Sequence, residues 1–235
     1  MAETTLLRVA MPDRVGSLAR VATRLAQAGI DIVRVEVVSA DGTTAIDDLL
    51  VRGPDPERVV ARVPSEARIV GVRDHGELPD PGLAMAAACA RVTGAATSAA
   101  ARIAVVEGAL ALADAHRGLL LGDGGDGWLR PLAATVPVEP VPRDAFAAAR
   151  AAVDDGAATT MSGDREWAPP AVRESMAAGA VAVVPVGDGS RPLVLCVART
   201  DWFPFVAAEM DRLRAFGRVA AGVLRAVDGR APTAP

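Results

Sequence analysis

Lysine, asparagine and tyrosine are absent from the 235-residue sequence, and cysteine and histidine occur only twice each. Cys89 and Cys196 are far apart and have no CxxC spacing, which argues against a disulfide framework and a zinc site. His75 and His116 have no second ligand at metal-binding spacing beside them. We therefore expect no metal and no cofactor, and we interpret the cysteines as small core residues.

Long apolar runs and an excess of basic charge are missing as well. No run reaches the ~20 residues that span a bilayer, and Met1-Ala2-Glu3 lacks the basic and then apolar order of a secretion signal. Acidic residues number 29 against 25 basic ones, and neither half of the chain is a basic block. With 51% hydrophobic residues the chain is expected to be globular and cytoplasmic, without a nucleic-acid or membrane partner.

The first segment changes its hydrophobic period in an informative order. Alternating and helical spacings follow one another, with Gly29 ending a helix and Asp41-Gly42 marking a hairpin turn. The pattern predicts a strand over 6–11, a helix over 18–28, strands over 33–40 and 45–51, a helix over 55–63 and a strand over 67–73. This βαββαβ order is typical of an α+β, ferredoxin-like domain over residues 5–74.

Residues 75–81 contain two prolines and a glycine, and we place the domain boundary over 75–82. Beyond it, over 83–227, we expect a second α+β domain, an antiparallel sheet with flanking helices. Its predicted elements are helices over 83–92 and 99–113 with Ser98 as N-cap, strands over 118–121 and 128–133, a helix capped by Asp144, a loose stretch over 156–179, strands over 181–186 and 193–197, and a helix over 206–227. Residues 228–235 are expected to be a tail.

The turn from the first strand into the first helix, residues 11–18, has chemistry that suits a zwitterion. A helix start offers free N–H groups to a carboxylate, Gly16 lets the backbone approach a ligand, and Asp13 could bind an ammonium group. The alternative interpretation is structural: Asp13 caps the helix, and Gly16 only makes the turn.

Two stretches of this segment carry a family resemblance. Asp13-Arg14-Val15-Gly16-Ser17-Leu18, followed by Leu25-Ala26-Gln27-Ala28-Gly29-Ile30-Asp31-Ile32, resembles an ACT domain over residues 5–74. The resemblance implies the ferredoxin-like fold, pairing of two domains, and an amino acid bound where they meet. It places Asp13, Val15 and Gly16 in the ligand-binding turn, and Ile30 and Asp31 opposite the paired domain. Many ACT domains only dimerise.

The second segment resembles a GAF domain over residues 83–227. The resemblance rests on Val181-Ala182-Val183-Val184-Pro185-Val186, the turn over 187–192, Leu193-Val194-Leu195-Cys196-Val197 and the long final helix. GAF domains are small-molecule sensing modules, so the resemblance implies a second ligand or a protein partner. It does not name the ligand class.

Other motifs are weaker. Residues 122–127 satisfy GxGxxG, but the extended, proline-containing sequence after them favours a hairpin turn over a dinucleotide site. Asp47-Asp48 lies within the third strand, and we expect an edge position that solvates both carboxylates, the alternative being that one faces a helix layer or an interface. The broad apolar stripe of the final helix packs within its own domain or forms a seam with a second copy.

No nucleophile elbow, HExxH helix or Walker loop is present, so no catalytic residues are expected. The sequence predicts a non-enzymatic, cytoplasmic regulatory homodimer that binds an amino acid and has a possible protein output partner. The alternatives are a ligand-free interaction protein and an enzyme built on a divergent GAF pocket.

Overall fold

A computed structural model describes residues 4–40, 42–53, 63–74, 80–147, 168–185, 193–201 and 203–229. The chain divides into two compact units, Met1–Pro79 and Asp80–Pro235, and each is described by itself. Several predicted features lie wholly or partly outside the described residues: the helix over 55–63, most of the 75–82 segment, the Asp144 helix beyond residue 147, most of the 156–179 stretch, the turn over 187–192 and the tail. The predicted domain limits, 5–74 and 83–227, stay predictions.

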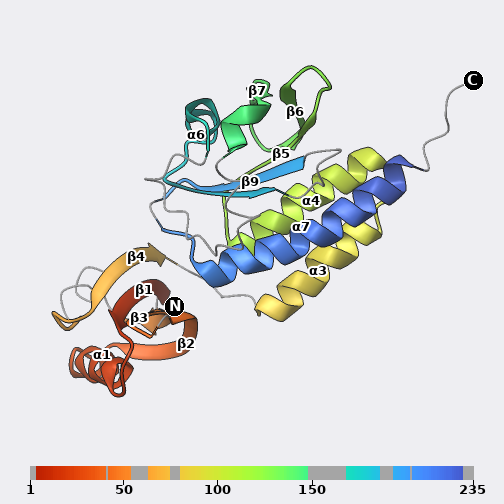
Figure 1. The fold of residues 1–235 in the computed structure, drawn as a ribbon. Coiled ribbons are helices and arrows are strands. Elements are labelled where there is room, and N and C mark those ends of the chain that lie inside the picture. The colour runs from red at the N-terminus through yellow and green to blue at the C-terminus, as the bar shows by residue number, and fades with distance from the viewer. Residues whose placement is uncertain are drawn as a thin grey trace, which may run out of the picture. The chain divides into compact units, whose positions relative to one another are not determined.

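The first unit is an antiparallel sheet with a helix on one face (Figure 1). Its described elements are β1 (Thr4–Pro12), α1 (Ser17–Gln27), β2 (Asp31–Ala40), β3 (Thr44–Arg52) and β4 (Arg68–Asp74). The strand order is β2-β3-β1-β4, and β1 pairs antiparallel with both β3 and β4. This is the ferredoxin-like arrangement that the sequence predicts.

The core of the first unit follows the predicted alternation. Alternate residues of β1 point toward α1 because successive side chains of a strand face opposite sides of the sheet. Gly29 ends the helix as predicted, with φ +73° and its N–H donating to the carbonyl of Ala26 at 2.9 Å. The buried cluster between sheet and helix contains Leu7, Val9, Met11, Val21, Leu25, Ile30, Leu49 and Val51.

Strand β2 lies at one edge of this sheet and exposes apolar side chains. Val33, Val35 and Val37 are 43%, 40% and 64% exposed. Val35 pairs with Leu49, a core residue of β3, so it points to the side of the sheet that carries α1. The alternation predicts the strand correctly, but these valines stay exposed because β2 is the edge strand of the sheet.

The second unit is a five-stranded antiparallel sheet in the order β7-β6-β5-β9-β8. Helices α4 and α7 pack against the sheet, and α3 packs against both of them (Figure 1). Gly108 of α4 is required by this packing, since a Cβ there would lie 2.7 Å from the Phe216 ring of α7. The elements are α3 (Pro81–Thr93), α4 (Ser98–Ala113), β5 (Arg117–Asp123), β6 (Trp128–Ala134), β7 (Val141–Pro142), the 3-10 turn η1 (Arg143–Phe146), α6 (Pro170–Ser175), β8 (Ala180–Pro185), β9 (Leu193–Arg199) and α7 (Ala207–Asp228).

A buried arginine joins the layers of the second unit. Arg199, at the end of β9, is 1% exposed and donates to the Glu209 carboxylate of α7 at 2.8 Å. The same guanidinium donates to the carbonyl of Ala113 at the end of α4 and lies 4.2 Å from the centroid of the Phe205 ring. Glu209 in turn accepts from the N–H of Val206 at the start of α7. One side chain therefore ties together a strand end, a helix end and a helix start.

Three predictions about this unit need correction. Thr97, not Ser98, caps α4: its hydroxyl accepts from the N–H of Ala100, and Ser98 is already helical. Asp144 does not cap a helix, because it lies within η1, whose start has no side-chain cap. Strand β7 and helix α6 are missing from the prediction, because the prolines near both elements indicate interruptions of regular structure. Pro170 in fact begins α6.

The apolar stripe of α7 packs within its own unit: Met210, Leu213, Phe216 and Ala220 all belong to the buried cluster. No described helix is both long enough and apolar enough to cross a membrane.

Replacing Arg199 by Met should lower the free energy of unfolding of the second unit by about 3–5 kcal/mol, because Glu209 would stay buried without its cation. All three tryptophans belong to residues 80–235, so tryptophan fluorescence during urea unfolding reports on this unit alone. Arg130→Gln removes the exposed Arg130–Asp126 pair and serves as the control, expected to cost under about 1 kcal/mol. Equal losses in the two variants would contradict the role assigned to Arg199.

Candidate functional site

The turn between β1 and α1 is fixed to the hairpin that follows β2. The N–H of Asp13 donates to the carbonyl of Thr43 at 2.9 Å, and its Oδ2 accepts from the N–H of Gly42 at 3.1 Å. Asp13 therefore does not cap α1, and its side chain holds the hairpin after β2 instead. Its Oδ1 has no hydrogen-bond partner among the described residues, so an exposed carboxylate oxygen faces solvent beside the turn.

Gly16 is the N-cap of α1 and has φ +86°, a left-handed conformation that other residues adopt at a cost. A Cβ there would meet only Arg20 Nη1, at 3.6 Å, so the glycine is needed for its backbone angle and not for space. The start of α1 has no side-chain cap. The N–H of Ser17 donates to the carbonyl of Arg14 at 3.2 Å, so the N–H groups of Leu18 and Ala19 are the ones that remain available to an anion. Val15, at the tip of the turn, is fully exposed.

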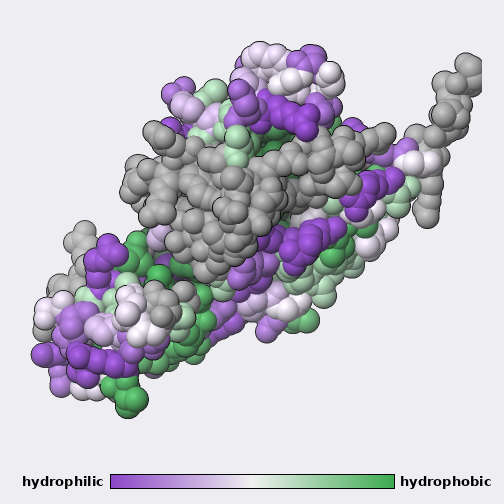
Figure 2. Space-filling view, in the orientation of Figure 1, coloured by the Kyte–Doolittle hydropathy of each residue, from purple (hydrophilic) through white to green (hydrophobic). Residues whose placement is uncertain are grey.

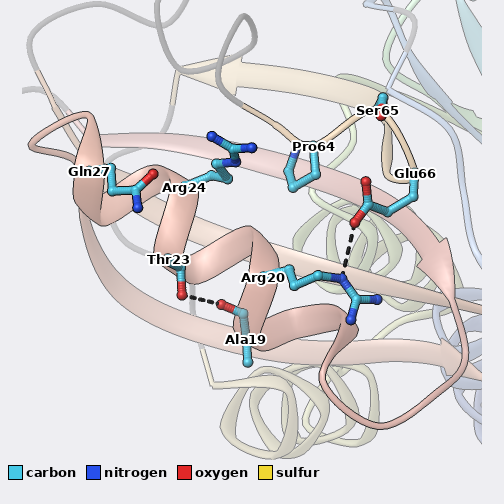
Figure 3. Close-up of a pocket in the computed structure, with 8 residues that line it drawn as sticks. All are labelled: Ala19, Arg20, Thr23, Arg24, Gln27, Pro64, Ser65 and Glu66. Carbon is cyan, nitrogen blue, oxygen red and sulfur yellow. Dashed lines mark hydrogen bonds and ion pairs between the residues drawn. The ribbon is translucent and has the colours of Figure 1, made fainter.

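Arg20 connects this turn to the segment before β4. Its Nη2 donates to Ser17 Oγ at 3.2 Å, and its Nε donates to Glu66 Oε1 at 3.0 Å (Figure 3). The pKa of the Glu66 carboxyl lies below its ordinary value, chiefly because its own backbone N–H donates to it, with the hydrogen bond from Arg20 and the charges of Arg20 and Arg14 adding to the effect. The Arg20–Glu66 ion pair thus lies beside the start of α1.

Ile30 and Asp31 lie at the opposite end of the sheet from Asp13. Asp31 pairs with Arg52, which pairs with Thr4 at the start of β1, whereas Asp13 follows the end of β1. The nine residues of β1 separate the two ends by roughly 30 Å. Ile30 is buried in the core, and Asp31 is exposed, 3.9 Å from the guanidinium of Arg52. One copy therefore brings together Asp13, Val15 and Gly16, but not Ile30 and Asp31.

Asp47 lies in a different environment from the solvated edge position that the sequence predicts. Both carboxylates of the Asp47-Asp48 pair are buried, so the predicted solvation of both is wrong. Asp48 forms a bidentate ion pair with Arg8, in which Nε donates to Oδ1 at 2.7 Å and Nη2 donates to Oδ2 at 2.6 Å. Asp47 points to the α1 side, since it pairs with Val9 of the core, and it is 3% exposed, with no hydrogen-bond partner for Oδ1 among the described residues.

The environment of Asp47 raises the pKa of its carboxyl. Burial is the main cause, and the negative charges of Asp48 and Asp13 add to it. A charged Asp47 is thus costly unless a positive group comes close to it and to Asp13. The doubled acids inside a strand are the sequence signal for this position, but only the register shows which of them lacks a partner.

The other sequence motifs have structural roles. Residues 122–127 comprise the last two residues of β5 and the hairpin turn that leads into the antiparallel strand β6, which confirms the hairpin prediction over the dinucleotide alternative. Arg130 Nη2 donates to Asp126 Oδ2 at 2.7 Å, and this hydrogen bond is the main cause of the lowered pKa of the Asp126 carboxyl. His116 Nδ1 accepts from the N–H of Thr200 at 3.0 Å. No group of three or more potential metal ligands occurs among the described residues.

Comparisons with known proteins agree with this two-part architecture. The family model of the ACT domain matches residues 5–63. Among solved structures, the GAF domain of a phosphoenolpyruvate-protein phosphotransferase from Coxiella burnetii is similar at 9% identity and a TM-score of 0.52, over 64% of this chain and 95% of that chain. Free methionine-R-sulfoxide reductase from Neisseria meningitidis is similar at 16% identity and a TM-score of 0.52, over 66% of this chain and 96% of that chain.

A bacteriophytochrome from R. palustris is similar at 10% identity and a TM-score of 0.51, over 96% of this chain and 58% of that chain. No curated protein matches the chain. At these identities the solved structures show the fold alone. The protein is therefore an N-terminal ACT domain followed by a domain of the GAF fold. Both resemblances drawn from the sequence are confirmed.

Replacing Asp47 by Asn should raise the free energy of unfolding of the first unit at pH 7 by about 1–2 kcal/mol, because a charge that costs energy to bury is removed. Since the pKa of Asp47 is higher in the folded than in the unfolded chain, this cost grows as pH rises through the folded pKa and vanishes below about pH 3.8, the ordinary value. Hydrogen exchange of β1 and β3 amides measures it.

Asp48→Asn is the matched control and should have the opposite sign, because it leaves the buried Arg8 without its ion-pair partner. If Asp47→Asn destabilises the unit at pH 7 as Asp48→Asn does, Asp47 has a partner that the described residues do not include.

Proposed function

We propose that the ACT domain binds an amino acid at the turn between β1 and α1. The GAF-like domain then binds a second small molecule or relays the signal to a protein partner. The chain is in this view a non-catalytic, cytoplasmic regulatory protein. The observation that supports the proposal best is the uncapped start of α1, with the left-handed Gly16, next to the exposed carboxylate of Asp13.

The charges around the turn suit the two ends of an amino acid. The ligand carboxylate would lie against the N–H groups of α1, where the helix dipole is positive and Arg20 is near. The ligand ammonium would lie against Asp13, with the negative charge of Asp47 behind it. A bound ammonium would lower the cost of keeping Asp47 charged, so ligand binding and the fold of the first unit reinforce each other.

A second copy of the chain would complete the five-residue site. Strand β2 runs from Asp31 to Ala40 and is followed by the hairpin that contacts Asp13. If the β2 edges of two copies pair antiparallel, the start of β2 in one copy lies beside its end in the other. Asp31 of the second copy would then approach the Asp13 turn of the first. Asp13 and Asp31 lie roughly 30 Å apart within one copy, at opposite ends of the sheet, so antiparallel pairing of two copies can bring Asp31 of one close to Asp13 of the other.

The surface of β2 supports pairing at this edge. Figure 2 shows hydrophobic side chains over β2, in agreement with the exposed valines of that strand. An exposed edge strand with apolar side chains is prone to pair with another strand. A homodimer would bury the valines and give the backbone N–H and C=O groups at the β2 edge hydrogen-bond partners.

An enzymatic function is less well supported. The similarity to a methionine sulfoxide reductase raises the question of a reactive thiol. Complete burial raises the pKa of the Cys196 thiol to about 12, so it is not ionised at neutral pH. Cys89 is half-buried on α3, where its Sγ lies 3.9 Å from Met85 Sδ. Neither thiol has the electropositive setting that activates cysteine.

Asp13→Ala and Gly16→Val should each weaken amino-acid binding about tenfold or more, the first by removing a charge-assisted hydrogen bond and the second by forcing a β-branched residue to φ +86°. A thermal-shift screen of the twenty amino acids identifies the ligand, because saturation at 100 times Kd stabilises the fold by about 2.7 kcal/mol. Calorimetry then compares the variants.

Asp144→Ala, an exposed acid in the second unit, serves as the control and should leave affinity unchanged. A screen in which no amino acid shifts the melting temperature would favour the ligand-free interaction protein. Unchanged affinity in Asp13→Ala would move the site away from the turn.

Light scattering should give a mass twice 24.0 kDa for the native chain. Val35→Lys should produce monomers, since a lysine on the edge of a sheet blocks strand pairing. Val72→Lys is the matched control: Val72 lies on the opposite edge strand, β4, and its exposure, 38%, is close to the 40% of Val35. A native monomer, or equal dissociation in both variants, would contradict pairing through β2.

A further inference from the structure

A pocket opens on the outer side of α1, away from the sheet. Its volume is about 510 Å³, within the range of small-molecule sites. One wall is a stripe of α1 and the other is the segment before β4, so the pocket lies wholly within the first unit (Figure 3). The lining residues are Ala19, Arg20, Thr23, Arg24, Gln27, Pro64, Ser65 and Glu66.

The charges in this pocket do not cancel. Arg20 is paired with Glu66 at 3.0 Å, and the Thr23 hydroxyl donates to the carbonyl of Ala19 at 2.8 Å. Arg24 has no ion pair or hydrogen bond to the residues that the structure describes, and in Figure 3 its side chain extends from α1 beside Pro64. Among the residues that the structure describes, the guanidinium of Arg24 is therefore uncompensated, and the amide of Gln27 and the hydroxyl of Ser65 lie on the pocket walls.

We propose that this pocket binds a small organic anion through Arg24. A guanidinium offers paired N–H donors that match a carboxylate or a phosphate, and the pocket supplies further polar groups to hold the same anion. The methyl group of Ala19 and the ring of Pro64 give it an apolar part as well. The ligand is thus a compact molecule with a carboxylate or phosphate group. This proposal does not rest on amino-acid binding at the turn.

Arg20 places this pocket in contact with the turn. The same guanidinium that forms the pocket wall donates to Ser17 and lies beside Gly16. An anion in the pocket competes with Glu66 for Arg20, because both would accept from it. The pocket is in this way connected to the start of α1 through one side chain.

The test uses the full chain and two probes, succinate and inorganic phosphate, titrated by calorimetry at low ionic strength. At least one probe should bind saturably, and the stronger probe identifies the anionic group. Arg24→Gln should weaken that binding about fivefold or more. Arg218→Gln removes an exposed arginine from α7 in the second unit, and should leave the affinity unchanged.

A second variant tests the pocket and not the charge. Ala19→Phe adds a bulky ring to the pocket lining while keeping both arginines, and should also weaken binding. Asp13→Ala should have no effect on either probe, which separates this proposal from amino-acid binding at the turn. The proposal fails if neither probe binds saturably, if Arg24→Gln and Arg218→Gln weaken binding equally, or if uncharged succinamide binds as well as succinate.

Discussion

The register in which β1 pairs with β3 fixes the position of each candidate residue in the first unit. It sets Val9 opposite Asp47, so that one acid of the doubled pair enters the layer beneath α1 while Asp48 reaches Arg8 on the other face. It also sets the start of β2 and the end of β1 at opposite ends of the sheet. A shift of β3 by one residue would turn Asp48 toward α1 in place of Asp47, and it would turn the core residues Leu49 and Val51 outward.

The second unit relies on a different kind of interaction. Arg199 satisfies carbonyl oxygens at the end of α4, where a helix leaves them without partners, and its charge is balanced by Glu209. Buried pairs of this kind add less to stability than their geometry suggests, but the loss of either member is costly. Since this group joins β9 to α4 and α7, it holds the helical layer at a fixed position on the sheet.

Much of the fold could be predicted from hydrophobic period and turn residues, because both domains obey them closely. The alternation of β1, the end of α1 at Gly29 and the hairpin turn after β5 are examples. The errors arise where the local signal fits two structures: Thr97 and Ser98 are both good caps, and the proline pair that indicates a break in fact precedes and begins helix α6. The state of Asp47 and the pocket beside Arg24 depend on contacts between distant segments, which no local pattern encodes.

The hydrogen bonds from Gly42 and to Thr43 make Asp13 part of the same rigid corner as the hairpin that follows β2. In the proposed dimer that corner meets the partner's β2, so each ligand would contact two chains. Ligand affinity would then rise with the abundance of the protein itself, since more copies would already be paired. The level of expression would set the amino-acid concentration at which the sensor responds, and a cell could retune it without altering any residue of the site.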